Sequence, residues 1–229
     1  MGGTPIFTGM NWNNLAIFPV MGERLSSKNA LHLDLTEGNE SLQLVAVSDT
    51  AAFDAFVFEQ LRAAGKTYGF GGYLEKRSIY RRSEVFATAQ ESFRNIHLGI
   101  DIWTLASSPI YAPLDGKVHS FQDNEGFGNY GPTILLQHQV EGRTLYSLYG
   151  HLQRKDLEGL VVGQVIRAGE QFCRVGPFPE NGDWPPHLHF QLIWDLNNLW
   201  GDYPGVAAEK DMEYYRQNCP DPAPLIGIF

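Results

Sequence analysis

Glycine and proline divide this chain into short apolar runs. It contains 24 glycines and 13 prolines among 229 residues, and 13% of the residues are aromatic. Because glycine and proline interrupt helices, whereas aromatic side chains pack well on pleated sheets, the pattern predicts many short strands and few helices. The clearest strands are expected at residues 109–112, 118–121, 133–138 and 144–148.

Two dipeptides between these runs are typical of tight turns. Asp115-Gly116 separates the first two runs, and Glu141-Gly142 separates the last two. The favoured two-residue hairpin turn needs positive φ at its central residues, which glycine adopts easily. We therefore expect a hairpin at each dipeptide, and an antiparallel β region around them.

The N-terminal extension, residues 1–90, is expected to be separate from this region. Strands are predicted at 31–35 and 42–47, on either side of a turn-rich segment. Apolar residues then recur at helical spacing behind a possible N-cap, and Gly65 can end the helix. The sequence therefore predicts one helix over about residues 50–64.

The rest of the chain is divided into a β-rich domain, residues 91–200, and a C-terminal tail, residues 201–229. A short helix is expected in the tail within residues 206–217. It must end before Pro220, because proline cannot continue a helix.

The charge balance excludes some partners. With 26 acidic and 17 basic residues the net charge is −9, and neither nucleic acid nor an anionic membrane is expected to bind a chain without a cationic face. The basic residues Lys76, Arg77, Arg81 and Arg82 are expected to form an ordinary solvated surface. No run approaches the roughly 20 apolar residues of a membrane helix, and no signal peptide is visible, so a cytoplasmic location is expected.

Four of the seven histidines lie in three short contexts of the β region. These are His97-Leu-Gly-Ile-Asp101, Tyr149-Gly-His151-Leu and His187-Leu-His189-Phe. Neutral imidazole and carboxylate are the groups that bind Zn²⁺ at catalytic sites, where water keeps the fourth position. The set therefore has the composition of a catalytic zinc site.

Strand geometry limits how these residues can meet. His187 and His189 are two apart, so in a strand they face the same side. His97 and Asp101 would lie about 13 Å apart in an extended strand, which is too far for one ion, so Gly99 is expected at a bend. His119 and Asp123 have the same spacing without a glycine, and we interpret them as ordinary hairpin residues.

The order and the flanking residues of these motifs resemble the lysostaphin and LytM type of zinc metallopeptidases, which cut peptides of bacterial peptidoglycan. The resemblance covers about residues 93–194 and includes the stretches 109–118 and 163–169. It implies a mainly β, α+β chain built on an antiparallel β-sheet sandwich, with the site in a groove. It also implies Zn²⁺ as the cofactor, and it assigns the residues as follows: metal ligands His97, Asp101 and His189, and catalytic residues His151 and His187.

Before the third histidine motif, His187-Leu-His189-Phe, the chain departs from the family pattern. Residues 176–186 contain four prolines with Phe178 and Trp184, and they could form an aromatic lip for a substrate or a packed loop. The function implied is a zinc metalloendopeptidase that hydrolyses a short or flexible peptide or a muropeptide. The alternative is an inactive module of the same fold that binds zinc or a ligand.

Overall fold

The computed structural model describes residues 12, 15–83, 86 and 93–227, and this part of the chain is mainly β. Its strands are β1 Ala30–His32, β2 Tyr68–Gly71, β3 Ile96–His97, β4 Ile100–Trp103, β5 Pro109–Tyr111, β6 Gly116–Asn124, β7 Gly131–Val140, β8 Arg143–Gly150, β9 Val165–Ile166, β10 Gln171–Arg174, β11 His187–Ile193 and β12 Val206–Ala207. Its α-helices are α1 Glu40–Gln43, α2 Thr50–Ala64, α3 Met212–Asn218 and α4 Ala223–Ile226. Short 3₁₀ helices lie at η2 Ile79–Arg82, η4 Arg154–Leu157 and η5 Glu209–Asp211.

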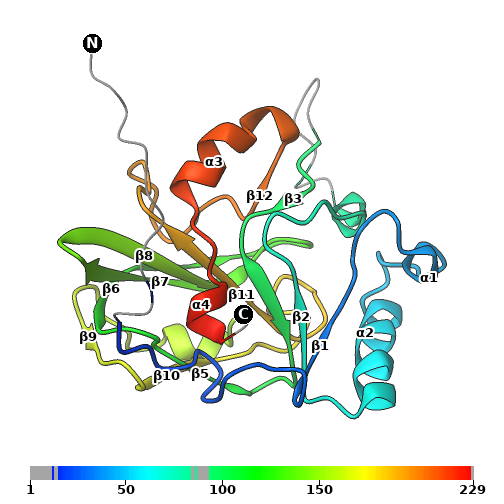
Figure 1. Cartoon of the computed structure of the whole chain (residues 1–229), viewed down its shortest axis with the longest axis horizontal. Coiled ribbons are helices and arrows are strands. Elements are labelled where there is room, and N and C mark those ends of the chain that lie inside the picture. Colours follow the sequence, from blue (N-terminus) through cyan, green and yellow to red (C-terminus); the bar gives the residue numbers. More distant parts are fainter. Residues whose placement is uncertain (1–11, 13–14, 84–85, 87–92, 228–229) are drawn as a thin grey trace.

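Eight strands form one sheet in the order β1-β2-β4-β11-β8-β7-β6-β9 (Figure 1). Its β1/β2 pair is parallel and its other pairs are antiparallel. The two edge strands, β1 and β9, contain three and two residues. Two small antiparallel sheets, β5/β10 and β12/β3, complete the β structure.

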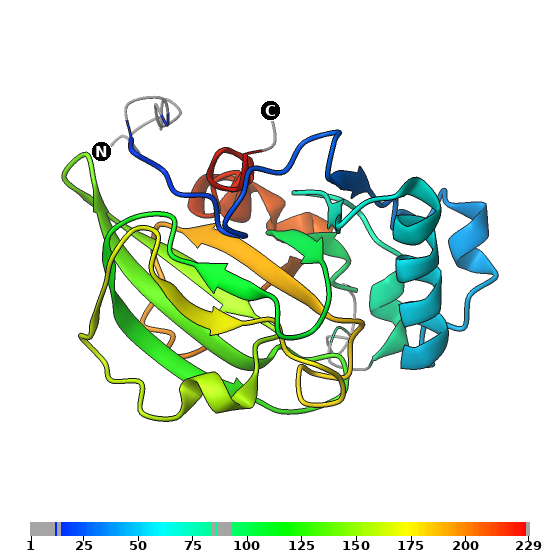
Figure 2. The same cartoon turned by 90° about the horizontal axis from the view of Figure 1, so that it is seen from below.

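The two faces of the central strands have different neighbours, because side chains alternate along a strand. Leu188, Phe190 and Leu192 of β11 pack into the main hydrophobic core, which includes Ile110 of β5 and Cys173 of β10. Figure 2 shows the small β5/β10 sheet lying over the large sheet. The opposite face carries the histidines of β11, so that one strand contributes both to the core and to the site.

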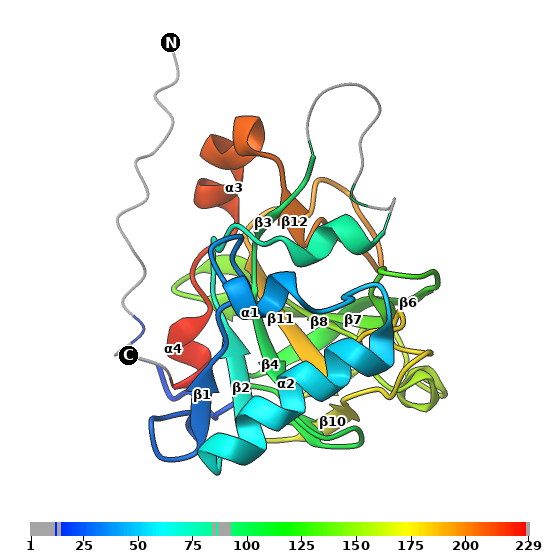
Figure 3. The ribbon, with the colours of Figure 1, turned by 90° about the vertical axis from the view of Figure 1, so that its right-hand side faces the viewer.

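Helix α2 packs against the β1/β2/β4 end of the sheet (Figure 3). Its buried Phe53, Val57 and Leu61 share a second core cluster with Trp103 of β4 and Trp184. Asp49 caps the helix by accepting a hydrogen bond from an amide of its first turn, and Gly65 ends it in the left-handed conformation. The helix expected at residues 50–64 is confirmed.

Several other expectations are confirmed by the strands. The four predicted β runs lie in or around β5, β6, β7 and β8, and the fold is mainly β, as expected. Glu141 and Gly142 both have positive φ and connect β7 to β8 in a two-residue hairpin.

The prediction of a hairpin at Asp115-Gly116 is wrong, because the strands on either side of it do not pair with each other. Strand β5 pairs with β10, and β6 pairs with β7 and β9. The Asp115 carboxylate instead accepts a hydrogen bond of 2.9 Å from the amide of Ala168, and its carbonyl accepts one from His138. Asp115 therefore connects its own segment to His138 of β7 and to the segment at Ala168, and it does not close a local turn.

Two flanking elements also differ from the expectation. Residues 42–47 are not a strand, because the Asn39 side chain caps the short helix α1, which includes residues 42 and 43, and turns follow it. The C-terminal helix begins only at Met212, since Val206–Ala207 form β12 and pair with β3. Among the described residues, no helix is long and apolar enough to span a membrane.

The prediction that four basic residues form a solvated surface is wrong for two of them. Arg77 is fully buried and Arg82 is 7% exposed. Arg82 donates hydrogen bonds to Thr50 at the start of α2 and to the carbonyl of Asp183, each of 2.9 Å, and its guanidinium stacks over Trp184. It thereby fastens the 176–186 segment to the N-terminal part of the chain.

Candidate active site

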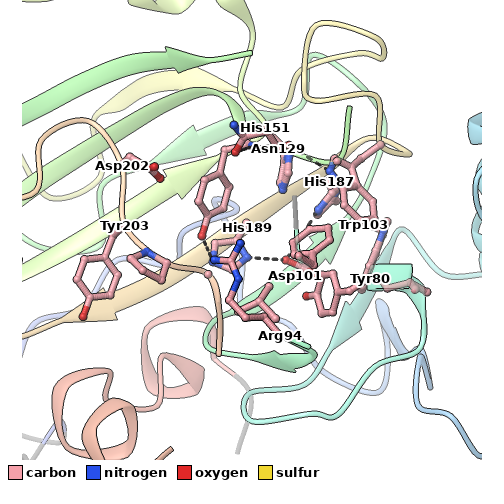
Figure 4. A pocket seen from close by; sticks show the side chains of 18 of the residues that line it. Tyr80, Arg94, Asp101, Trp103, Asn129, His151, His187, His189, Asp202 and Tyr203 are labelled. Carbon is pink, nitrogen blue, oxygen red and sulfur yellow. Dashed lines mark hydrogen bonds and ion pairs between the residues drawn. The ribbon is translucent and has the colours of Figure 1, made fainter. Parts of the chain in front are cut away.

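Strands β3, β4, β8 and β11 bring the five expected residues together. Figure 4 shows Asp101, His151, His187 and His189. His189 of β11 lies directly opposite Asp101 of β4, and His187 faces the same side two residues earlier. His97 ends β3, and His151 follows the end of β8. All five side chains are buried.

Gly99 allows His97 to approach Asp101. The chain bends at Gly99 between β3 and β4, as the spacing of the motif predicts. A Cβ at this position would lie 2.6 Å from the carbonyl oxygen of Phe190 and 2.9 Å from the His189 ring. Glycine is therefore required here by close approach to β11.

His97, Asp101 and His189 could hold a metal ion. Asp101 Oδ1 lies 3.2 Å from His97 Nε2 and 3.0 Å from His189 Nδ1, and these two nitrogens are 2.9 Å apart. Ligands about 2.0 to 2.1 Å from a tetrahedral zinc ion lie about 3.3 Å from each other. The three donors thus have both the chemistry and the spacing of a catalytic zinc site.

Hydrogen bonds on the far side of each ring fix these donors. His97 Nδ1 lies 3.2 Å from the carbonyl of Gly72, and His189 Nε2 lies 2.9 Å from Gln191 Oε1. The amide orientation of Gln191 is set by its own donation to the carbonyl of Pro204. Because both acceptors are oxygens, each ring donates there, which leaves His97 Nε2 and His189 Nδ1 as the free ligand atoms.

His151 and His187 lie beside this cluster with their rings 4.1 Å apart. His151 Nδ1 lies 2.8 Å from the carbonyl of Asn181, and His187 Nδ1 lies 2.7 Å from that of Pro185. A carbonyl only accepts, so both rings donate from Nδ1 and present an unprotonated Nε2 when neutral. The His187 Nε2 atom lies 3.8 Å from Asp101 Oδ1, next to the metal donors.

The backbone at His151 is held in the left-handed region, with φ of 62°. Its amide donates to the carbonyl of Tyr130, and its own carbonyl accepts from the amide of Gly176. This conformation is uncommon for a residue with a Cβ and is found where a neighbouring structure enforces it, often at functional sites.

A cavity of about 310 Å³ opens onto the cluster. It is lined by Asp101, His151, His187 and His189 together with aromatic side chains that include Trp103 and Trp184. The 176–186 segment contributes only part of this wall: Trp184 lines the cavity, whereas Phe178 does not and is 40% exposed. The segment is thus a packed loop that presents one aromatic side chain to the site.

The sequence interpretation missed several residues that support the site. Asn181 is fully buried, and its side chain donates to the carbonyls of Gly176 and Trp184, which holds the loop. Gln191 could have been found, because it follows His187 and His189 at the same period of two.

His119 and Asp123, which have the same spacing as His97 and Asp101, lie on β6 and outside the site. Asp123 forms an ion pair with Arg154.

Acid is expected to destabilise the metal-free protein. Burial, with a smaller contribution from Arg77, lowers the pKa of His97 to about 3, and burial lowers the pKa of His187 to about 4. In the unfolded chain both titrate near 6.5, so between these values the unfolded state binds more protons. The stability is therefore complete above pH 6.5 and falls as the pH drops towards 4, by up to about 1.4 kcal/mol per pH unit for each histidine.

Denaturant unfolding with chelator at pH 7.5, 6 and 5 measures this effect. Because carboxylates also contribute to acid unfolding, a His187→Asn variant is the matched comparison. It should lose less stability than the wild type over the same range. Equal losses in the two proteins would contradict the expected titration.

Comparison with known proteins places these residues in a family. The model of peptidase family M23 matches residues 95–199. This part of the chain belongs to peptidase family M23. The family inferred from the histidine motifs is thereby confirmed, and the M23 match contains His97, Asp101, His151, His187 and His189.

Three relatives are similar to the M23 part of the chain. An uncharacterized metalloprotease of Haemophilus influenzae is 27% identical over 115 residues, which are 49% of this chain and 22% of that protein. The catalytic domain of lysostaphin from Staphylococcus simulans is 22% identical, with a TM-score of 0.36 over 53% of this chain and 80% of its own. A zinc-containing peptidase from Vibrio cholerae is 24% identical, with a TM-score of 0.33 over 43% of this chain and 27% of its own. The chain thus covers about a fifth of its curated relative.

Proposed function

We propose that this chain is a zinc-dependent metalloendopeptidase that hydrolyses a short or flexible peptide, such as a stem or bridge peptide of peptidoglycan. The observation that carries the proposal is the arrangement around one cavity. Two of the three metal donors at zinc spacing line this cavity beside two histidines with unprotonated Nε2 atoms, in a domain of a peptidase family. His97, Asp101 and His189 are the proposed ligands, and His151 and His187 the proposed catalytic residues.

The chemistry is divided between the ion and the two histidines. Zinc bound by three protein ligands would lower the pKa of a water molecule and polarise the scissile carbonyl. One of His151 and His187 accepts the proton of the attacking water at Nε2. Since a neutral ring with Nδ1 bonded to a carbonyl carries no hydrogen on Nε2, only the ring that has accepted this proton can donate it to the leaving amine.

The low pKa values of the two rings agree with the role of acceptor. Burial lowers the pKa of His187 to about 4, and burial together with the neighbouring His187 lowers that of His151 well below its ordinary value. Both rings are therefore neutral at pH 7 and ready to accept a proton.

The shape of the cavity supports a short peptide as the substrate. Its volume of about 310 Å³ is at the lower end of the range for ligand sites. Among the described residues, its wall combines aromatic rings with the guanidinium of Arg94 and the carboxylate of Asp202. A wall that combines aromatic rings with polar groups can bind both the apolar and the polar parts of a short peptide.

Metal analysis followed by a peptide screen tests the proposal. The protein purified without chelator should contain about one zinc per chain. It should then cleave one class among glycine-rich bridges, muropeptides and other short peptides, and chelator should abolish cleavage until zinc is restored. His151→Ala is the control for contaminating peptidases, because it should keep the zinc and lose the cleavage.

Two outcomes would contradict the proposal. A well-folded protein that neither contains zinc nor takes it up would remove the metal site. Zinc uptake with ligand binding but without cleavage of any peptide would favour the inactive binding module.

A further inference from the structure

Arg77, from the N-terminal extension, reaches the proposed metal centre. Its side chain is fully buried between two carboxylates. Nη1 pairs with Asp101 Oδ2 and donates to the hydroxyl of Tyr80 at 3.3 Å, and Nε donates to Glu75 Oε2 at 2.6 Å. The guanidinium also lies over the Trp103 ring, 5.7 Å from its centre.

We propose that Arg77 is a positioning residue of the metal centre, which holds Asp101 so that only Oδ1 faces the ion. This inference rests on the proposed zinc site. The two carboxylate oxygens of Asp101 have separate partners: Oδ1 faces His97 and His189, whereas Oδ2 is bound by Arg77. A carboxylate fixed in this way would bind the ion through one oxygen and would leave room for water.

The charges around Arg77 indicate that it fixes the orientation of the Asp101 carboxylate. They do not indicate that it changes the net charge of the metal site. Glu75, 8% exposed at its side chain, neutralises Arg77 from the side away from the cluster. The Arg77–Glu75 pair therefore adds no net charge behind Asp101. A planar guanidinium can hold two carboxylates at fixed angles, which a lysine ammonium cannot do.

The surrounding backbone is adapted to this side chain. Gly71 of β2 pairs with Asp101 in the sheet, and a Cβ on Gly71 would lie 2.7 Å from Arg77 Nη2. The next residue, Gly72, accepts the hydrogen bond from His97 Nδ1. Residues 71–77 thus contact two of the three proposed ligands, so this part of the N-terminal extension belongs to the metal centre.

Zinc affinity of Arg77 variants, measured by competition with a chelator, tests this role. Partners behind metal ligands typically contribute 10- to 100-fold to affinity, and we expect a loss in this range for Arg77→Lys. The double variant Arg77→Met with Glu75→Gln should lose as much or more. Because Glu75→Gln removes the carboxylate of Glu75 when Arg77→Met removes its cation, the double variant does not bury this carboxylate unpaired. It is therefore expected to fold even if Arg77→Met alone does not.

Cobalt spectra and a surface control make the result specific. Co²⁺ bound to Arg77→Lys should show a changed visible spectrum, because the spectrum follows coordination geometry, which a merely structural residue would leave intact. Arg81→Met is the matched control, since Arg81 lies in the 3₁₀ helix η2 just after Arg77, with a side chain 69% exposed. Its zinc affinity should equal that of the wild type.

The outcomes separate this inference from the proposed function. Folded variants at Arg77 that bind zinc within twofold of the wild type, with an unchanged cobalt spectrum, would overturn the positioning role and leave the peptidase proposal intact. A wild-type protein that binds no zinc would overturn both.

Discussion

Replacement of His189 by alanine is expected to remove zinc binding and, with it, all peptide hydrolysis. His189 supplies the Nδ1 donor that lies within 3.0 Å of both other ligand atoms. Loss of a direct ligand should reduce zinc affinity by more than the 10- to 100-fold typical of outer partners. Elemental analysis and chelator competition measure the loss, and circular dichroism verifies the fold.

A buried histidine outside the cluster provides the control. His138 of β7 is 1% exposed and lies between the carbonyl of Asp115 and the hydroxyl of Ser147. A His138→Asn variant should lose stability but keep its zinc. If His189→Ala still binds one zinc with wild-type affinity, the ligand assignment is wrong.

Replacement of His151 or His187 by alanine should also abolish turnover, but these variants should keep their zinc. Neither residue is a proposed ligand, and each presents Nε2 to the cavity. Removal of a general acid or base typically lowers rates by about 10² to 10⁴. We expect kcat to fall by this factor in each variant, while KM changes little.

The pH dependence of kcat/KM then assigns the base. The acid limb of the wild-type profile should lie below pH 6.5, because burial lowers the pKa of both rings. The variant that lacks this limb has lost the base. His119→Ala is the control, and a variant at position 151 or 187 that keeps more than a tenth of kcat would exclude that residue from catalysis.

Local sequence patterns predicted the elements that depend on local interactions. The α2 helix, with its cap and its final glycine, and the Glu141-Gly142 hairpin are set by neighbours a few residues away. The bend at Gly99 also followed from the spacing of His97 and Asp101. In each case the constraint lies within the motif itself.

The wrong predictions concern pairings between distant segments. Asp115-Gly116 has the composition of a hairpin turn, but the partner of β5 is β10, sixty residues further along the chain. The burial of Arg77 could not be read locally either, since its partner Asp101 is 24 residues away, on strand β4. A basic residue beside other basic residues is usually solvated, and only the fold reveals the two carboxylates around it.

The edges of the large sheet have a consequence for self-association. Long strands such as β7 and β8 lie inside the sheet, whereas the edges are β1 and β9, with three and two residues. A free edge is the template on which a second chain can add a strand, so short edges limit growth of the sheet from one molecule to the next. At these two edge strands, the described part of the sheet therefore offers few backbone groups for amyloid-like stacking.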